Sequence, residues 1–305
     1  MQRRSFLQTM SALGAAAGLP LGARAAGKAA YDPAAKYELK VTEVPFRQNS
    51  AGRQLMARIY QPQGAGPFPT LLDLHGGAWL RKDRKAEEPM DRAIAASGVL
   101  VVAIDMTLSG EAPYPACVQD ASYGVRWLKL HARGWKGDPS TLGIYGSSSG
   151  GHVAELLAMR PNDARYNAIP LAGDATVAYA ATRSPISDPY ARWQQAERRK
   201  NENLINASKT YFRPWETIHE GNPQEILERK EKVVLRPLLI MQGELDDNVL
   251  PAVQEKFAKT YQAAGGDVQY ELYANSVHEW VAEPGPQTTR AHEMVKAYIA
   301  RQLAA

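Results

Sequence analysis

The fold is indicated most strongly by Thr141–Met159, which has the sequence TLGIYGSSSGGHVAELLAM. An apolar run typical of a short buried strand comes first, and a run with the composition of a helix comes last. The residues between them, Gly146–Gly150, match the pattern G-x-S-x-G. A serine on so tight a strand-to-helix turn has a strained backbone that lifts its hydroxyl clear of the sheet. Because the turn leaves room only for glycine two places on either side, the pattern selects Ser148 from three consecutive serines as a nucleophile.

The base that would activate this serine is predicted from its place after the last strand. A serine hydroxyl becomes a strong nucleophile when a base takes its proton and an acid orients that base. His278 is the predicted base because it lies in the loop that follows the last predicted strand, Val268–Tyr273. His152 is closer to Ser148 in sequence, but its place in the first turn of the helix is unfavourable for collinear proton transfer.

The orienting acid is expected after the preceding strand, in Gly243–Val249, which has the sequence GELDDNV. Asp246 is favoured because it lies three residues beyond the glycine that ends the strand, while Asp247 and Glu244 remain alternatives. Asp247 would then point outward and cap the helix that starts near Pro251. The order serine, aspartate, histidine along the chain is that of hydrolases built on a doubly wound sheet.

A glycine-rich loop follows the first predicted parallel strand and has the sequence Leu74-His75-Gly76-Gly77-Ala78-Trp79. The negative oxygen of a tetrahedral intermediate needs fixed hydrogen-bond donors. We predict that the backbone N–H groups of Gly77, Ala78 and Ser149 form this oxyanion hole. His75 is predicted to fix the loop rather than to act as a second base. A plain tight turn remains the alternative explanation for the paired glycines.

Apolar runs that alternate with helical patterns predict the architecture. Alternating apolar residues in Tyr37–Arg47 and Arg53–Gln61 indicate a hairpin. The predicted strands that follow are Thr70–Leu74, Val99–Asp105, Thr141–Tyr145, Thr176–Ala181, Val234–Gln242 and Val268–Tyr273. The predicted helices are Ala86–Ser97, Cys117–Arg133, Gly150–Arg160, Pro251–Ala264 and Arg290–Leu303. Strands that are apolar on both faces indicate an α/β protein with a mostly parallel, doubly wound sheet.

One long segment, Ser184–Pro223, interrupts this alternation and is rich in charged and aromatic residues. An insertion of this size between two strands would lie at the carboxyl edge of the sheet, where such folds bind their ligands. We therefore interpret residues 26–305 as one domain with a helical cap insertion at about 184–223. The alternative is a solvated surface excursion, which the charged run Glu197–Glu202 favours.

Together these motifs resemble the α/β-hydrolases of the HGG-x-W carboxylesterase kind. The similar families are the feruloyl-esterase-associated family labelled BD-FAE, the hormone-sensitive-lipase-like esterases and the arylformamidases. The matching residues are His75-Gly76-Gly77-Ala78-Trp79, Gly146–Gly151, Gly243–Val249 and Ser276-Val277-His278, with Ser184–Pro189 similar to the segment that enters the cap. The resemblance runs from about Tyr37 to the C-terminus. It departs at Ala78, where many esterases have a third glycine, and the added methyl group would narrow the acyl side of the pocket.

The resemblance and the motifs predict a serine carboxylesterase that hydrolyses small to medium carboxylic esters through the triad Ser148, Asp246 and His278 and an acyl-enzyme. Trp79 and Trp280 are predicted to contact the substrate. An amidase of the arylformamidase type is the alternative enzyme, and a non-catalytic binding protein on a hydrolase scaffold is the alternative outside catalysis. We expect no cofactor and no metal, because no histidine pair has the spacing of metal ligands.

Composition limits the partners of the chain. Its 36 basic residues exceed its 32 acidic residues by four, but three of the arginines lie in residues 1–25, which contain no acid. The remainder is nearly neutral, so neither nucleic acid nor an anionic membrane is an expected partner. Cys117 is the only cysteine, which excludes an intrachain disulfide, and we predict a buried small hydrophobe there. The sequence leaves the oligomeric state open.

Residues 1–25 have the pattern of an export signal. Arg3-Arg4 is followed by an apolar stretch from Met10 to Leu21, and Ala23-Arg24-Ala25 fits a cleavage site after Ala25. The arrangement resembles a twin-arginine signal, with an ordinary secretory signal or an uncleaved anchor as alternatives. We expect an exported protein, periplasmic or secreted, with no membrane span in its mature part.

Overall fold

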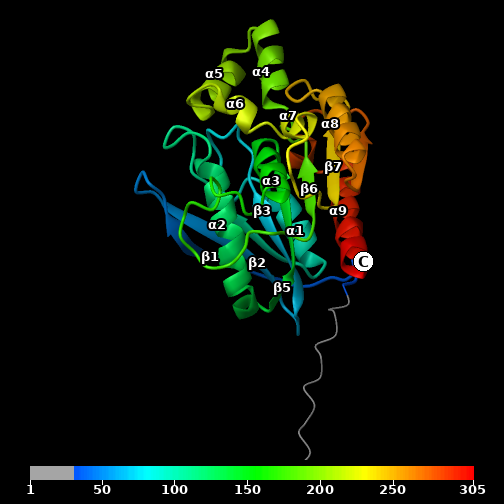
Figure 1. Ribbon diagram of the computed structural model, residues 1–305. Coiled ribbons are helices and arrows are strands. Elements are labelled where there is room, and N and C mark those ends of the chain that lie inside the picture. Colours follow the sequence, from blue (N-terminus) through cyan, green and yellow to red (C-terminus); the bar gives the residue numbers. More distant parts are fainter. Residues whose placement is uncertain (1–30) are drawn as a thin grey trace, which may run out of the picture.

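The computed structural model describes residues 31–305 and contains one eight-stranded sheet. The strand order is β1-β2-β4-β3-β5-β6-β7-β8 (Figure 1). β1 and β2 form an antiparallel hairpin, and β2 also pairs antiparallel with β4. Every other neighbouring pair of strands is parallel. The strands are β1 (Leu39–Gln48), β2 (Gln54–Pro62), β3 (Phe68–Leu74), β4 (Leu100–Ile104), β5 (Gly137–Ser147), β6 (Ala180–Arg183), β7 (Leu238–Gly243) and β8 (Val268–Tyr273).

Successive residues of the central strands enter opposite cores, because side chains alternate between the two faces of a sheet. In β4, Leu100, Val102 and Ile104 belong to one core. The residues between them, Val101 and Ala103, belong to the other. All five are fully buried. A strand that is apolar on both faces requires cover on both sides, as the sequence indicates.

Helices supply that cover. The first core contains residues of α2 (Ala116–His131), α3 (Ser149–Met159) and α8 (Pro251–Ala263). The second core contains residues of α1 (Glu88–Ala96) and α9 (Pro286–Ala304). The two groups of helices therefore lie on opposite faces of the sheet, and the predicted α/β architecture with a mostly parallel, doubly wound sheet is confirmed.

Two strand predictions are wrong at their N-terminal ends. Thr176–Ala181 was expected as a strand, but β6 begins at Ala180. Before it, Ala178 N–H donates to the Leu142 carbonyl in an irregular approach to the sheet. Val234–Gln242 was likewise expected, but β7 begins at Leu238, directly after Pro237. Proline has no N–H to donate to a neighbouring strand, so the regular ladder starts one residue later.

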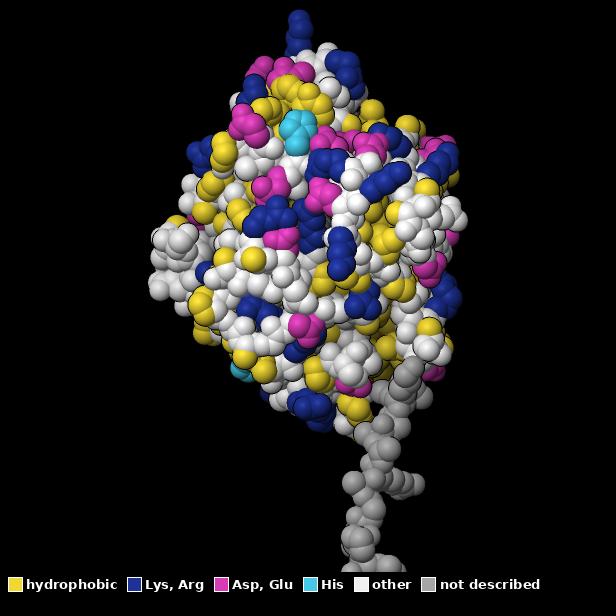
Figure 2. All heavy atoms as spheres, viewed as in Figure 1, with side chains coloured by type: hydrophobic (Ala, Val, Ile, Leu, Met, Phe, Trp, Pro, Cys, Tyr) yellow, Lys and Arg dark blue, Asp and Glu magenta, His cyan; other side chains and the backbone are white. Residues whose placement is uncertain are grey.

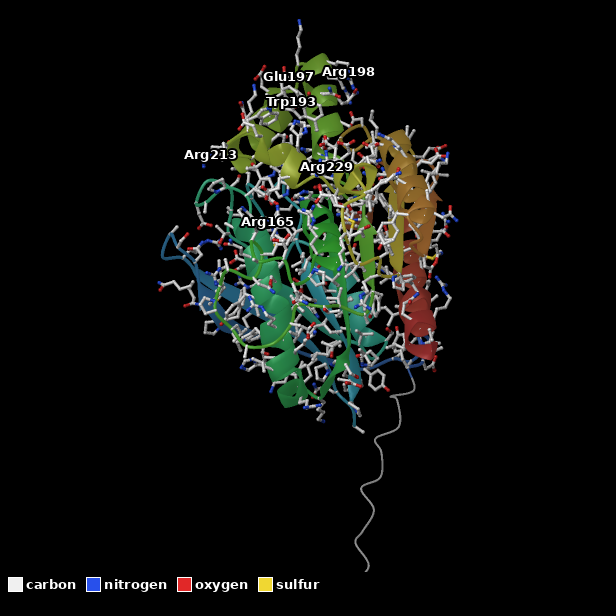
Figure 3. All side chains as sticks on the ribbon, viewed as in Figure 1. Arg165, Trp193, Glu197, Arg198, Arg213 and Arg229 are labelled. Atoms are coloured by element: carbon white, nitrogen blue, oxygen red, sulfur yellow. The ribbon has the colours of Figure 1, made fainter. Side chains whose placement is uncertain are left out.

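The segment after β6 is helical and lies beyond the carboxyl edge of the sheet, at the top of Figure 1. It contains α4 (Pro189–Arg198), α5 (Glu202–Tyr211), α6 (Thr217–Glu220) and α7 (Pro223–Glu228). Asp188 and Asn201 cap α4 and α5 by accepting the backbone N–H groups of Ala191 and Leu204. The charged run Glu197–Glu202 is exposed, and Figure 3 shows Glu197 and Arg198 at the end of α4 far from the sheet.

Charges of both signs are interspersed over the visible face of the molecule (Figure 2). Within residues 31–305, no helix is both long enough and apolar enough to cross a membrane. The predicted export signal lies outside the residues that the structure describes, so it stays a prediction.

A buried group of acids lies beneath the carboxyl edge of the sheet. Glu87, directly before α1, accepts hydrogen bonds from Ser147 Oγ at 2.5 Å and from Arg183 Nη2 at 3.1 Å. Asp73 on β3 and Asp91 on α1 are fully buried, and none of their carboxyl oxygens has a hydrogen-bond partner among residues 31–305. Burial, together with the neighbouring acids, raises the pKa of both carboxyl groups well above the ordinary value.

Replacing Asp91 with Asn should therefore change how stability depends on pH. A carboxyl group whose folded-state pKa is raised favours the folded state below its unfolded pKa of about 4, and loses that contribution as pH rises toward the folded value. As pH rises across this interval, the free energy of unfolding of Asp91→Asn should increase relative to that of the native chain by about 1.4 kcal/mol per pH unit. Urea unfolding between pH 5 and pH 9 measures the difference.

Glu283 is exposed and gives a matched control as Glu283→Gln. Its unfolding profile should run parallel to that of the native chain. A parallel profile for Asp91→Asn as well would contradict the raised pKa.

Candidate active site

The proposed nucleophile lies on a sharp turn between β5 and α3. Ser148 has φ 51° and ψ −117°, a conformation that non-glycine residues rarely adopt. A Cβ atom at Gly146 would overlap the Gly150 carbonyl, and one at Gly150 would overlap the Leu74 carbonyl at the end of β3. The pattern therefore needs glycine at both positions for steric reasons, and the Ser148 residue is left 7% exposed.

Three side chains from distant parts of the chain meet at this turn. His278 Nε2 lies 2.9 Å from Ser148 Oγ, and His278 Nδ1 lies 2.7 Å from Asp246 Oδ2. Because an ionised carboxylate only accepts hydrogen bonds, Nδ1–H donates to Asp246. Nε2 is then free to accept the hydroxyl proton of Ser148. The structure thus brings the three predicted triad residues into one hydrogen-bonded chain.

Asp246 is held in place by further donors. Its Oδ1 accepts the backbone N–H groups of Asn248 at 3.0 Å and Val249 at 2.8 Å, and its Oδ2 also accepts Gln242 Nε2 at 3.1 Å. Burial raises the pKa of this carboxyl group, but the hydrogen bond and charge of His278 and the Val249 N–H outweigh it and hold the pKa below its ordinary value. Asp246 is therefore a fixed anion.

The two alternative acids lie elsewhere. Glu244 accepts the backbone N–H of Asn275 at 2.9 Å. Asp247 points outward and pairs with Arg199 of the cap at 2.9 Å. The prediction that Asp247 caps the following helix is wrong, because α8 begins after Leu250 without a side-chain cap, and the Asp247 carboxylate is already taken by Arg199.

The loop that was predicted to supply oxyanion donors lies against the serine. A Cβ atom at Gly76 would lie 3.2 Å from Ser148 Cβ. Gly77 and Ala78 have positive φ angles of 108° and 54°, and within residues 31–305 their backbone N–H groups have no acceptor. Ser149 is the first residue of α3, so its N–H has no partner inside the helix either. All three predicted N–H groups are therefore free to donate.

The side chain of Ser149 has a second role that the sequence did not indicate. Its Oγ accepts the backbone N–H of Trp79 at 3.1 Å. Leu80 N–H and Arg81 N–H both approach the Gly77 carbonyl, at 3.1 and 3.2 Å. The loop is thus a tight turn, as the alternative explanation proposed, and it is also tied to the helix that carries Ser148.

His152 is not part of the triad but links three segments around it. It is fully buried, its Nδ1 accepts the indole N–H of Trp79 at 3.2 Å, and its Nε2–H donates to the Gly221 carbonyl at 2.7 Å. Burial lowers its pKa to about 4, so the ring is neutral. His152 therefore connects the helix behind Ser148 to the glycine-rich loop and to the cap.

The two tryptophans predicted to contact the substrate are nearly buried. Trp79 is 4% exposed and stacks on Tyr211 of the cap with ring centroids 4.5 Å apart. Trp280 is 9% exposed and stacks on Tyr273 at 5.0 Å. Both rings are packing elements in this structure, and a substrate contact for either stays a prediction.

Arg183 lies at the end of β6 and contacts the site, a role that the sequence did not indicate. Its Nη1 donates to the backbone carbonyl of His278 at 2.7 Å, while its Nη2 is held by Glu87 at 3.1 Å. The guanidinium is buried. This bridge fixes the loop that carries the predicted base. In the sequence, the only feature of Arg183 that could have indicated a role in the site is its position at the end of a strand.

Neither of the remaining candidate groups takes part in the triad, and His75 bonds within the glycine-rich loop, as predicted. Cys117 is buried, its Sγ lies 3.0 Å from the Tyr211 hydroxyl, and burial raises its pKa to about 12. His75 is buried and donates from Nδ1 to the Gly76 carbonyl at 2.8 Å. Among residues 31–305, no group of three or more His, Cys, Asp or Glu side chains has an arrangement suited to a metal ion.

A mostly parallel sheet with an aligned serine, histidine and aspartate at its carboxyl edge defines the α/β-hydrolases. Within that class, the chain belongs to the BD-FAE family, whose model matches residues 58–261, from β2 to α8. The resemblance inferred from the sequence motifs is confirmed. The family match covers the elbow, the glycine-rich loop, the cap and Asp246, and ends before His278.

Individual relatives match over shorter segments. Carboxylesterase NlhH of Mycobacterium tuberculosis is 32% identical over 108 residues, which are 35% of this chain and 34% of that protein. Esterase LipI of the same species is 33% identical over 130 residues, which are 41% of this chain and 40% of that protein. The chain thus matches well under half the length of either relative.

The solved structure of an inhibited esterase B from Lactobacillus rhamnosis has the same fold. Its TM-score is 0.74 at 17% identity, and the superposition covers 88% of this chain and 89% of that one.

Replacing Gly150 with Ala tests the steric basis of the elbow. Its methyl group would overlap the Leu74 carbonyl, so we expect a loss of more than about 3 kcal/mol in the free energy of unfolding, or failure to fold. Gly134, where an added Cβ meets nothing within 4 Å, gives the control Gly134→Ala, which should be neutral or stabilising by up to about 1 kcal/mol. Thermal and urea unfolding measure both, and equal stability of the two variants would refute the steric argument.

Proposed function

We propose that the protein is a serine carboxylesterase that hydrolyses small to medium carboxylic esters. The observation that carries the proposal is the 2.9 Å approach of His278 Nε2 to Ser148 Oγ on a strained turn, with Asp246 aligned behind the imidazole. A hydroxyl placed in this way can lose its proton to the histidine as it attacks a carbonyl carbon.

In the proposed mechanism, Ser148 Oγ forms a bond to the ester carbonyl carbon while its proton passes to His278 Nε2. The carbonyl oxygen becomes negative and accepts hydrogen bonds from the N–H groups of Gly77, Ala78 and Ser149. His278 then gives its proton to the departing alkoxide, which leaves the acyl group on Ser148. Water, activated by the same histidine, releases the acid, and Asp246 stays ionised throughout.

The names of the relatives support an ester as substrate, since the two described above are called a carboxylesterase and an esterase. The limit to small and medium esters rests on Ala78. Its methyl group lies in the loop where many esterases have glycine, and Trp79 beside it is packed under the cap. We therefore expect the space beside the donors to be narrow.

Ser148→Ala should lower kcat on p-nitrophenyl acetate and butyrate by about 10⁴-fold or more, with an unchanged melting temperature, because the nucleophile is lost. A fluorophosphonate should add its mass to the native chain at Ser148. The neighbouring variant Ser147→Ala should still form this adduct, since Ser147 Oγ is turned toward Glu87. Retained turnover in Ser148→Ala, or an adduct at another serine, would refute the assignment.

Two adjacent aspartates allow the proposed acid to be tested with a matched pair. Asp246→Asn should lower kcat by about 10³–10⁴-fold, because the amide can no longer hold His278 in the reactive tautomer. Asp247→Asn should leave kcat within about twofold, since this side chain is exposed and pairs with Arg199 on the surface. Steady-state rates on p-nitrophenyl butyrate distinguish the two, and equal effects would contradict the role of Asp246.

A further inference from the structure

A buried arginine of the cap lies between the two loops that flank Ser148. Arg192 belongs to α4 and is 4% exposed. Its guanidinium carbon lies 5.7 Å from the ring centroid of Trp79, the residue that follows the proposed oxyanion donors. On the other side, its Nε donates to Asn248 Oδ1 at 2.9 Å. Asn248 itself donates its backbone N–H to Asp246, so the guanidinium lies beside the proposed acid loop as well.

The outer nitrogens of this guanidinium have no partner. Within residues 31–305, neither Nη1 nor Nη2 of Arg192 meets a hydrogen-bond acceptor. Asp246 is the nearby acid whose charge acts on Arg192, but its oxygens already accept N–H groups from Asn248, Val249, His278 and Gln242. Arg192 therefore lies near the negative charge of Asp246, but the oxygens of that carboxylate already accept other N–H groups.

The other buried arginines of the described chain show that this is unusual. Arg126 donates from both Nη atoms to the carbonyls of Leu171 and Ile169. Arg160 donates to Glu220 and Glu231, and Arg183 donates to His278 and Glu87. A buried charge without hydrogen-bonded partners is costly. Arg192 nevertheless remains protonated at neutral pH, since burial lowers its pKa only to about 10 and the charge of Asp246 opposes that effect.

Packing alone does not explain the choice of arginine at this position. Contact with the face of Trp79 and the bond from Nε to Asn248 leave the Nη N–H groups unused. These groups form a planar fork that matches the two oxygens of a carboxylate. A carboxylate entering from the direction of Ser148 would supply the acceptors that the protein itself does not.

We propose that Arg192 binds a carboxylate carried by the substrate, so that the preferred substrates are esters with a second, ionised acid group on the acyl or the alcohol side. This proposal rests on the proposed esterase function. The reacting ester lies at Ser148, and the carboxylate lies in the fork of Arg192, between Trp79 and Asn248. Neutral esters of the same size bind without satisfying the guanidinium and are poorer substrates.

Two matched ester pairs, followed by pH-stat titration, test the proposal and separate the two sources of the carboxylate. Monomethyl glutarate against methyl pentanoate tests the acyl side, and the butyrate ester of 3-hydroxypropanoate against propyl butyrate tests the alcohol side. For the native chain we expect kcat/KM to favour the charged member of one pair by about tenfold or more, mainly through KM, as for a charge-assisted hydrogen bond.

Arg192→Met keeps the apolar stem and removes the charge, and its preference within that pair should fall to about one or below. Arg192→Lys keeps a charge without the fork and should retain part of the preference. Arg198→Met, on the same helix but at its exposed end (Figure 3), is the control and should leave both rates unchanged. If neither Arg192 variant folds, glutarate should still inhibit the native chain competitively and more strongly than pentanamide.

The outcomes separate this proposal from the esterase function. A native chain that is inactive on all four esters contradicts the esterase proposal. An active chain without preference in either pair, or a preference that Arg192→Met retains, overturns the carboxylate proposal alone. Equal inhibition by glutarate and pentanamide would also overturn it.

Discussion

The close approach of α3 to the end of β3 is the constraint on which the site depends. Gly150 lies against the Leu74 and His75 carbonyls, and Gly146 lies against Gly150 itself. Without side chains at these points, the helix can start directly after Ser148 with the serine at φ 51°. The same contact brings Ser149 Oγ within reach of Trp79 N–H. One steric fit therefore sets the position of the hydroxyl and of the loop that is proposed to stabilise the oxyanion.

The neutral ring of His152 extends this fit to the cap. It needs one donor and one acceptor, and it finds them in the indole of Trp79 and the carbonyl of Gly221. A protonated ring would lose the first of these bonds, which agrees with its low pKa. Because Trp79 also stacks on Tyr211, the glycine-rich loop is held from the helix below and from the cap above.

The sequence predicts those parts of the site that follow from local rules. Ser148, Asp246 and His278 each follow a strand of a parallel sheet, and the carboxyl ends of such strands meet at one edge. Arg183 and His152 could not be assigned, because their roles depend on distances to segments far away in the chain. Asp247 was wrongly expected to cap α8 because the competing partner, Arg199, comes from the cap. The start of β6 was misplaced because the apolar run enters the sheet later than its composition indicates.

The buried charges near Ser148 are satisfied in different ways, and the differences bear on the role of Arg192. Glu87 accepts a hydrogen bond from Arg183 Nη2, and Asp246 is surrounded by four donors. Asp73 and Asp91 have raised pKa values, which favour the neutral form and avoid a buried charge. Arg192 does not become neutral in the same way, because a pKa of about 10 leaves its guanidinium charged at neutral pH. Its Nη N–H groups meet no acceptor within residues 31–305, and these are the groups that we propose a carboxylate of the substrate to satisfy.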